Sequence, residues 1–171
     1  MNTKRETLDY YLQILEDTMI ISKCSRFDGK SRKSLQDEQK YDLADLSFYF
    51  APNIDNRINY GPVLENIVSA YAKSKGRSVS VGRIGKLECD FILRTPEMSY
   101  AYIQVAMTII NSWETEDREY RPIEMIRDNY PKFIAARNDP IQHRNGIVHE
   151  NMTEPVGRKQ GLEEAMDRGE H

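Results

Sequence analysis

The stretch that decides the fold is Val81-Gly-Arg-Ile-Gly-Lys-Leu-Glu-Cys-Asp-Phe-Ile-Leu93. Gly85 and Lys86 at its centre predict a tight turn between a short strand over 78–83 and a longer strand over 87–94. Alternation in the longer strand predicts one face with Leu87, Cys89, Phe91 and Leu93, and another with Glu88, Asp90, Ile92 and Arg94. Asp90 then lies in an otherwise apolar strand, where a buried carboxylate needs a hydrogen-bond partner or a ligand.

The elements on either side of this stretch predict an α+β core. A helix is expected from Pro62 to Gly76, because proline suits the first turn and glycine suits the position after the last one. Its apolar stripe has helical spacing, with Glu65 beside it: Leu64, Ile67, Val68, Tyr71 and Ala72. A third strand is expected over 100–107, with Tyr102, Gln104 and Ala106 on one face.

The first 58 residues predict a winged-helix-like segment. A helix over 7–17 precedes two short strands, 19–24 and 41–43, and the polar stretch 25–39 between them is interpreted as a loop. Lys30, Arg32 and Lys33 lie in this loop and could contact a phosphate backbone as a wing. A solvated hairpin with no ligand is the alternative, because runs of charge usually form ordinary surface. A short helix and a linker are expected over 42–59.

Beyond the third strand, a helix is expected over 115–129, a strand over 132–136 and a last edge strand over 147–149. His143 and His149 have no partners at zinc-site spacing, so both are interpreted as loop surface. The predicted organisation is therefore a winged-helix-like segment over 1–58, a core over 59–150 and a polar tail over 151–171.

Composition limits the class of protein. The 171 residues carry a formal charge of −3, which argues against attraction of nucleic acid to the whole surface but leaves room for a local basic patch. Only two cysteines occur, which favours a reducing cytoplasm over a disulfide scaffold. No apolar run is long enough for a membrane span, so no membrane association is expected.

Glu65, Asp90 and Gln104 together predict a nuclease-like metal site. A helix acid, a strand acid and a polar residue on the next strand have the layout of restriction-endonuclease-like folds, where oxygen ligands hold Mg²⁺. Gln104 stands where a second strand acid belongs, and Ala106 where a lysine belongs, so the site is interpreted as degraded. Lys86 or Arg94 could supply the missing cation. The alternatives are a helix-dipole role for Glu65 and a buried hydrogen-bonding role for Gln104.

Several separated motifs carry a resemblance to a known family. They are 10–17, Glu65-Asn-Ile-Val68, Val81-Gly-Arg-Ile-Gly85, Asp90-Phe-Ile92, Tyr102-Ile-Gln-Val-Ala106, Arg118-Glu-Tyr-Arg-Pro122 and Asp128-Asn-Tyr-Pro-Lys132. In this order, over about residues 5–150, they resemble a C-terminal domain of unknown function that follows the ATPase domain of bacterial and archaeal AAA+ ATPases. That family is similar to the PD-(D/E)XK nuclease superfold, and the Gln-Val-Ala form of the third motif recurs in it.

The resemblance implies a module that accompanies a nucleotide-driven motor and contacts DNA or a protein partner. Gly82-Arg-Ile-Gly-Lys86 lacks the glycine spacing of a phosphate-binding loop, so no bound nucleotide is expected and the ATPase half is interpreted as absent. Three functions follow as hypotheses: an accessory domain with a degraded site, a Mg²⁺-dependent deoxyribonuclease that uses Glu65, Asp90 and Gln104, and an oligomerisation module. The oligomeric state is left open.

Overall fold

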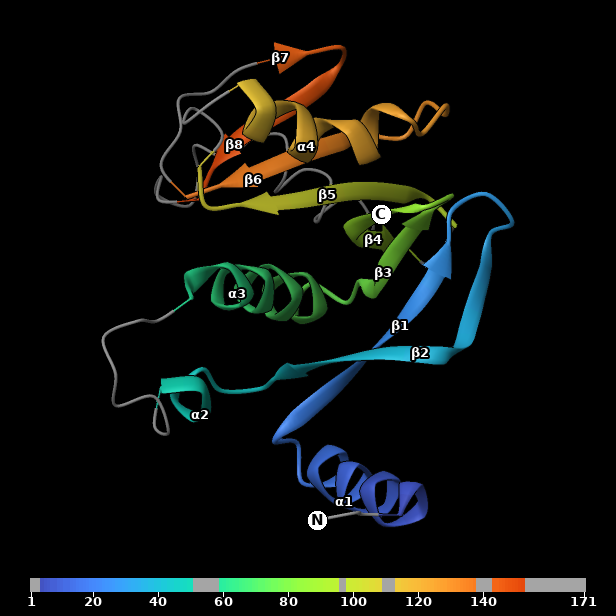
Figure 1. Ribbon diagram of the computed structural model, residues 1–171, viewed down its shortest axis with the longest axis vertical. Coiled ribbons are helices and arrows are strands. Elements are labelled where there is room, and N and C mark those ends of the chain that lie inside the picture. Colours follow the sequence, from blue (N-terminus) through green and yellow to red (C-terminus); the bar gives the residue numbers. More distant parts are fainter. Residues whose placement is uncertain (1–3, 51–58, 96–97, 109–112, 138–142, 153–171) are drawn as a thin grey trace.

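The computed structural model describes residues 4–50, 59–95, 98–108, 113–137 and 143–152 (Figure 1). In these residues, eight strands form one mixed sheet in the order β2-β1-β3-β4-β5-β6-β8-β7. The elements are α1 (Arg5–Asp17), β1 (Ile21–Asp28), β2 (Lys33–Leu43), α2 (Ser47–Phe50), α3 (Tyr60–Ser74), β3 (Ser78–Ile84), β4 (Leu87–Arg94), β5 (Tyr100–Ala106), α4 (Trp113–Glu124), β6 (Lys132–Ala136), β7 (His143–Arg144) and β8 (Ile147–Asn151). The predicted α+β class is confirmed. No described helix is long and apolar enough to cross a membrane.

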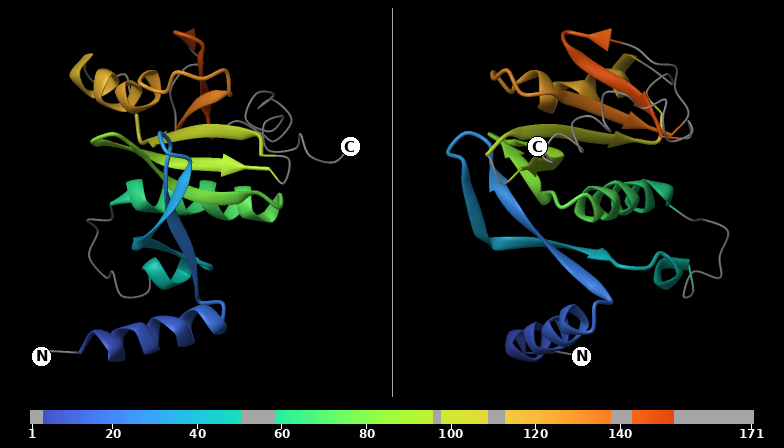
Figure 2. Two further views of the ribbon diagram at one scale, coloured as in Figure 1. Left: turned by 90° about the vertical axis from the view of Figure 1, so that its right-hand side faces the viewer. Right: turned by 180° about the vertical axis from the view of Figure 1, so that it is seen from behind.

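The two longer helices of the core cover opposite faces of the sheet (Figures 1 and 2). On one face, Val68 and Ala72 of α3 pack on Phe91, Leu93 and other apolar residues of the central strands. On the other face, Tyr120 and Ile123 of α4 belong to a second cluster with side chains from β4, β5 and β6. The predicted helix 62–76 is confirmed. Asn59 caps it by accepting a hydrogen bond from the Gly61 N–H, and Gly76 follows its end with φ of +70°.

The N-terminal hairpin differs from the prediction. Residues 25–39, expected to be a loop, are mostly strand, because β1 extends to Asp28 and β2 begins at Lys33. A register shift between Ser25 and Arg26 interrupts the pairing, so the buried side chains of β1 do not alternate regularly. β1 also pairs in parallel with β3, and the hairpin therefore belongs to the same sheet as the core. The winged-helix resemblance of 1–58 stays a prediction, as does the domain boundary at 58/59.

A β-bulge in β4 corrects the predicted alternation around Asp90. Ser80 pairs with Ile92 while Gly82 pairs with Cys89, so β4 has one residue more than β3 between these pairs. Cys89 therefore packs with the α4-side cluster, whereas Phe91 packs with the α3-side cluster, although both were expected on one face. Bulges re-aim side chains and are frequent beside active sites. Here the bulge places Asp90 between the two faces.

The C-terminal part of the core is only partly as predicted. The strand over 132–136 is confirmed, but α4 ends at Glu124 rather than near residue 129. β8 pairs with both β6 and β7, so it is an internal strand rather than the sheet edge. His149, expected on a loop surface, is 1% exposed within β8. The tail predicted over 151–171 begins too early, because β8 extends to Asn151, and residues 153–171 lie outside the described residues.

Candidate functional site

Asp90 lies where β4 and β5 separate. Regular pairing of the two strands begins at Phe91 and Ile103, one residue beyond Asp90 and Gln104. At Asp90, hydrogen bonds between side chains and the backbone connect the two strands. The Val105 N–H donates to Asp90 Oδ2 over 2.7 Å, and the Asp90 N–H donates to Gln104 Oε1 over 3.4 Å. The carboxylate therefore continues the hydrogen bonding between β4 and β5 beyond their last regular pair.

The surroundings of Asp90 favour its neutral form. Burial raises the pKa of this carboxyl from 3.8 to about 7, and the negative charges of Glu65 and Glu119 act in the same direction. The hydrogen bond from Val105 and the positive charge of Lys40 oppose this rise. Near neutral pH the group is thus divided between acid and carboxylate, and small changes in its surroundings alter its charge.

Glu65 approaches from α3 and is already paired. Lys40 of β2 donates its Nζ–H to Glu65 Oε2, and the two side chains are 35% and 25% exposed. The same ammonium lies 5.4 Å from the centre of the Phe91 ring. Burial would lower the pKa of Lys40, but the hydrogen bond to Glu65 and the charges of Glu65, Asp90 and Asp42 raise it. Lys40 is therefore a fixed cation beside the two predicted acids.

Gln104 points to the other face of the sheet. It is 8% exposed, and its Nε2 donates to Glu119 Oε2 of α4 over 3.2 Å. The second oxygen of Glu119 accepts from Arg118 over 2.8 Å. Because the Gln104 oxygen also accepts from the Asp90 N–H, both ends of its amide have partners in the protein. This is the buried hydrogen-bonding role that the sequence left as an alternative.

The three predicted site residues therefore come from both sides of the sheet. Glu65 lies on the α3 side, Gln104 on the α4 side, and Asp90 in the gap between β4 and β5. The charge of Glu65 reaches Asp90 and raises the pKa of its carboxyl.

These donors do not fit Mg²⁺ in their present arrangement. Mg²⁺ requires near-octahedral oxygen coordination. However, the Glu65 carboxylate faces an ammonium, and the Gln104 oxygen and one Asp90 oxygen already accept N–H groups. Among the described residues, no group of three or more His, Cys, Asp or Glu side chains could hold a metal ion.

Two residues beside the predicted site were missed from the sequence. Lys40 lies between the predicted loop 25–39 and the predicted short strand 41–43, whereas β2 in fact includes it. Glu119 lies in the predicted helix, but the sequence gives no sign that this residue contacts Gln104. The cations considered instead lie elsewhere: Lys86 is exposed in the β3–β4 turn, and Arg94 donates to Ser78 Oγ over 3.2 Å. A lysine two residues before the buried Asp42 in β2 was the available signal, but it needed a correct assignment of that strand.

The three predicted phosphate contacts surround the β1–β2 turn. Lys30 and Lys33 are exposed. The Arg32 guanidinium lies 5.1 Å from the Tyr100 ring centre and 5.7 Å from that of Tyr130. Arg32 is exposed like the two lysines, but its guanidinium also contacts these rings and so holds the turn against the sheet.

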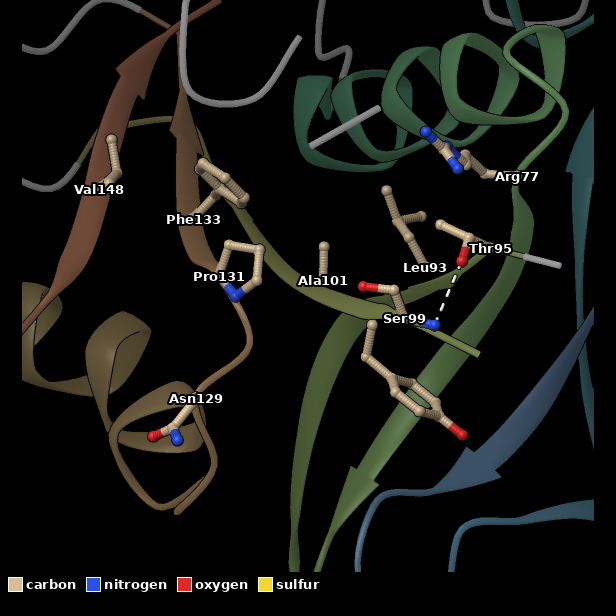
Figure 3. Close-up of a pocket in the computed structure, with 10 residues that line it drawn as sticks. Arg77, Leu93, Thr95, Ser99, Ala101, Asn129, Pro131, Phe133 and Val148 are labelled. Atoms are coloured by element: carbon tan, nitrogen blue, oxygen red, sulfur yellow. Dashed lines mark hydrogen bonds between the residues drawn. The ribbon is translucent and has the colours of Figure 1, made fainter. Parts of the chain in front are cut away.

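A separate cavity of about 410 Å³ lies at the opposite ends of β4 and β5 from Asp90 (Figure 3). Its lining combines an apolar floor with a few polar groups: Arg77, Leu93, Thr95, Ser99, Tyr100, Ala101, Asn129, Pro131, Phe133 and Val148. Figure 3 shows Thr95 and Ser99 joined by a hydrogen bond of 3.2 Å at its rim. None of Glu65, Asp90 and Gln104 lines this cavity, so it is not part of the candidate site.

Comparisons with known proteins provide one relative and no functional description. No protein-family model matches the chain, and no solved structure matches it. An uncharacterised protein of Haemophilus influenzae (strain Rd) is 32% identical over 135 residues, which are 78% of this chain and 32% of that protein. The chain thus spans about a third of the length of this relative, and similarity to it is what the comparisons establish.

Proposed function

We propose that this chain is a nuclease-like domain that binds nucleic acid without efficient cleavage, as an accessory module of an AAA+-type ATPase. The single observation that carries the proposal is that the oxygens of the predicted metal site already accept hydrogen bonds from the protein itself. Asp90 and Gln104 form hydrogen bonds that join β4 to β5, and Lys40 forms an ion pair with the Glu65 carboxylate. A site that forms its own hydrogen bonds and ion pair has few oxygens left for a catalytic metal. Cys24 and Cys89 are free and buried, which agrees with a cytoplasmic location.

The proposed nucleic-acid contact includes the exposed lysines of the β1–β2 turn. Lys30 and Lys33 can each replace a counterion on a phosphate, so binding should weaken as salt rises. The test is an electrophoretic mobility shift of DNA at low salt, first without divalent metal and then with Mg²⁺ or Mn²⁺. We expect a retarded band, intact DNA and weaker binding for the Lys30→Ala/Lys33→Ala variant. No retardation at low salt would refute the binding function.

The proposed attachment to an ATPase uses the apolar face of α1. This helix has no buried residue, and Leu8, Tyr11 and Ile14 are 53%, 58% and 39% exposed. Exposed apolar faces of this kind mark contacts with a partner. The Haemophilus relative extends well beyond the aligned region, which supports a larger assembly that contains such a domain.

Gel filtration with a purified AAA+ ATPase domain from the organism that encodes this chain tests this attachment. The wild type should co-elute with the ATPase domain, and a Leu8→Glu/Tyr11→Glu variant should not. Co-elution that both substitutions leave unchanged would remove α1 as the contact.

A Mg²⁺-dependent deoxyribonuclease is the second candidate, favoured by the presence of a lysine and two acids close together: Lys40, Glu65 and Asp90. For this activity, Lys40 would have to release Glu65, and Gln104 would have to release the Asp90 N–H. Incubation with plasmid and with single-stranded DNA in Mg²⁺ or Mn²⁺ tests it, with Asp90→Ala as the control. Cleavage by the wild type that disappears in the variant would favour the nuclease, while cleavage that persists in the variant would exclude this site.

A further inference from the structure

Trp113, the only tryptophan of the chain, stands at the start of α4 and is 72% exposed. It is held in place despite this exposure. The Arg144 guanidinium lies 5.4 Å from the indole ring centre and forms ion pairs with three carboxylates of α4: Glu116 (3.2 Å), Asp117 (3.3 Å) and Glu124 (3.0 Å). Arg144 is thereby fixed from several directions, and the indole has a rigid support against it. Most of the ring remains open to solvent.

A hollow of about 360 Å³ lies beside this indole. It is lined by Leu87, Trp113, Glu114, Asp117, Arg118 and Arg121. Its size is within the range of small-ligand pockets. Asp117 shares the Arg144 guanidinium with Glu116 and Glu124, so its charge is only partly compensated. Arg118, whose side chain is 74% exposed and pairs with Glu119, and Arg121, also exposed, present guanidinium groups at this hollow. Glu114 and Asp117 are the opposing charges in its lining.

This combination suits one unpaired nucleotide better than a long duplex. An exposed indole with a cation behind it offers a stacking surface to any base, and two arginines can contact the adjacent phosphates. The formal charge of −3 and the carboxylates of α4 argue against an extended electrostatic track along this face. Stacking would therefore dominate binding, with two phosphate contacts in support.

The hollow is also linked to the candidate site. Leu87 lies three residues before Asp90 in β4, about 10 Å along the strand. Arg118 holds Glu119, which accepts the amide of Gln104, and Gln104 accepts the Asp90 N–H. A nucleic-acid strand bound at the hollow would thus lie against the α4 side of the candidate site.

We propose that Trp113, Arg118 and Arg121 form a stacking site for an unpaired base, which makes single-stranded or frayed nucleic acid the preferred ligand. This inference rests on the proposed function, because it takes the ligand to be nucleic acid. It is independent of metal and of cleavage.

Tryptophan fluorescence provides a direct test, since the emission reports on a single residue. The full chain is titrated with oligothymidylate in the presence of a chelator, and binding is followed in parallel by anisotropy of a labelled oligonucleotide. We expect saturable quenching of Trp113 by the oligonucleotide. An abasic oligonucleotide of equal length and a blunt hairpin duplex should each quench much less.

Variants separate stacking from charge. Trp113→Ala should weaken binding by about 5- to 150-fold, the range for loss of one stacked base, and Trp113→Phe should restore part of it. Replacing Arg118 and Arg121 together by alanine removes two phosphate contacts. The slope of log affinity against log salt concentration should then become less negative by about 1.4. Lys30→Ala/Lys33→Ala, the matched control, should lower affinity but leave the quenching at saturation unchanged.

The outcomes distinguish this inference from the proposed function. Binding by anisotropy with no change in Trp113 fluorescence, or with full affinity in Trp113→Ala, would overturn the stacking site and leave nucleic-acid binding standing. Equal quenching by the abasic oligonucleotide would also overturn it, because contact with phosphate alone would then be sufficient. No binding by either readout would overturn both.

Discussion

Substitution of Asp90 by asparagine tests the interpretation of the candidate site most directly. The asparagine side-chain oxygen can still accept from the Val105 N–H, so the link between β4 and β5 is retained while the charge is removed. The pKa of Asp90 is about 7 in the folded protein and 3.8 in the reference state, chiefly because the carboxyl is buried. This difference corresponds to at most about 4 kcal/mol of destabilisation above pH 7, with each pH unit contributing about 1.4 kcal/mol.

The sign follows from proton binding. Between the two pKa values the folded protein keeps the Asp90 proton and the unfolded chain loses it, so the free energy of unfolding falls as pH rises through this window. Above pH 7 both states are ionised at this position and the contribution becomes constant. Asp90→Asn should therefore match the wild type near pH 4 and exceed it in stability near pH 8.

Urea denaturation of both proteins from about pH 4.5 to about pH 8 measures the effect as a difference that grows with pH. Asp45→Asn is the control, because Asp45 is exposed and bonds to Ser47 lower its pKa instead of raising it. A stability difference between wild type and Asp90→Asn that is constant across the range would refute the buried, partly neutral carboxyl. So would a variant that is less stable than the wild type at high pH.

Three further predictions concern the neighbourhood of this site. Lys40→Met removes a positive charge that lowers the pKa of Asp90, so that pKa should rise above about 7 in a carboxyl-carbon NMR titration. Asp42→Ala leaves the buried Ser69 hydroxyl without its acceptor and the half-buried Lys73 ammonium with Ser22 alone, and it should cost about 1–3 kcal/mol in urea denaturation. Gly82→Ala places a methyl 2.8 Å from a side chain across the β4 bulge and should cost about 1–3 kcal/mol, whereas Gly61→Ala, with no contact under 3.4 Å, should cost less.

The central elements could be predicted because their residues carry local signals. β4 and β6 have the predicted bounds, since apolar runs lie between turn residues such as Gly85 and Pro131. The helix over 60–74 was found from its stripe and its terminal residues. In β5, the faces of Tyr102 and Ile103 are as expected, because no bulge interrupts the alternation there.

What the sequence did not reveal depends on contacts between distant segments. The polar strands β1 and β2 lack an apolar alternation, because they lie at one side of the sheet and are only partly covered. The bulge at Asp90 depends on pairing with Gly82, which no local pattern specifies. The ion pair of Lys40 with Glu65 joins residues 25 positions apart, so it could not be found when β2 was predicted to begin only at Tyr41.

The competition between Lys40 and a divalent cation leads to a last prediction. In the wild type, Glu65 binds an ammonium whose own pKa is raised by that pairing, so Mg²⁺ must displace a permanent cation to reach both acids. If Lys40 is removed, Glu65 and the ionised fraction of Asp90 have no ammonium beside them, and Mg²⁺ should bind more tightly to Lys40→Met than to the wild type. Thermal denaturation at pH 8 with increasing Mg²⁺ measures this, since a ligand present at a hundred times its Kd stabilises by about 2.7 kcal/mol. Strong Mg²⁺ stabilisation of the wild type, lost in Lys40→Met, would mean that the lysine supports the metal rather than replacing it, and the nuclease would then become the better proposal.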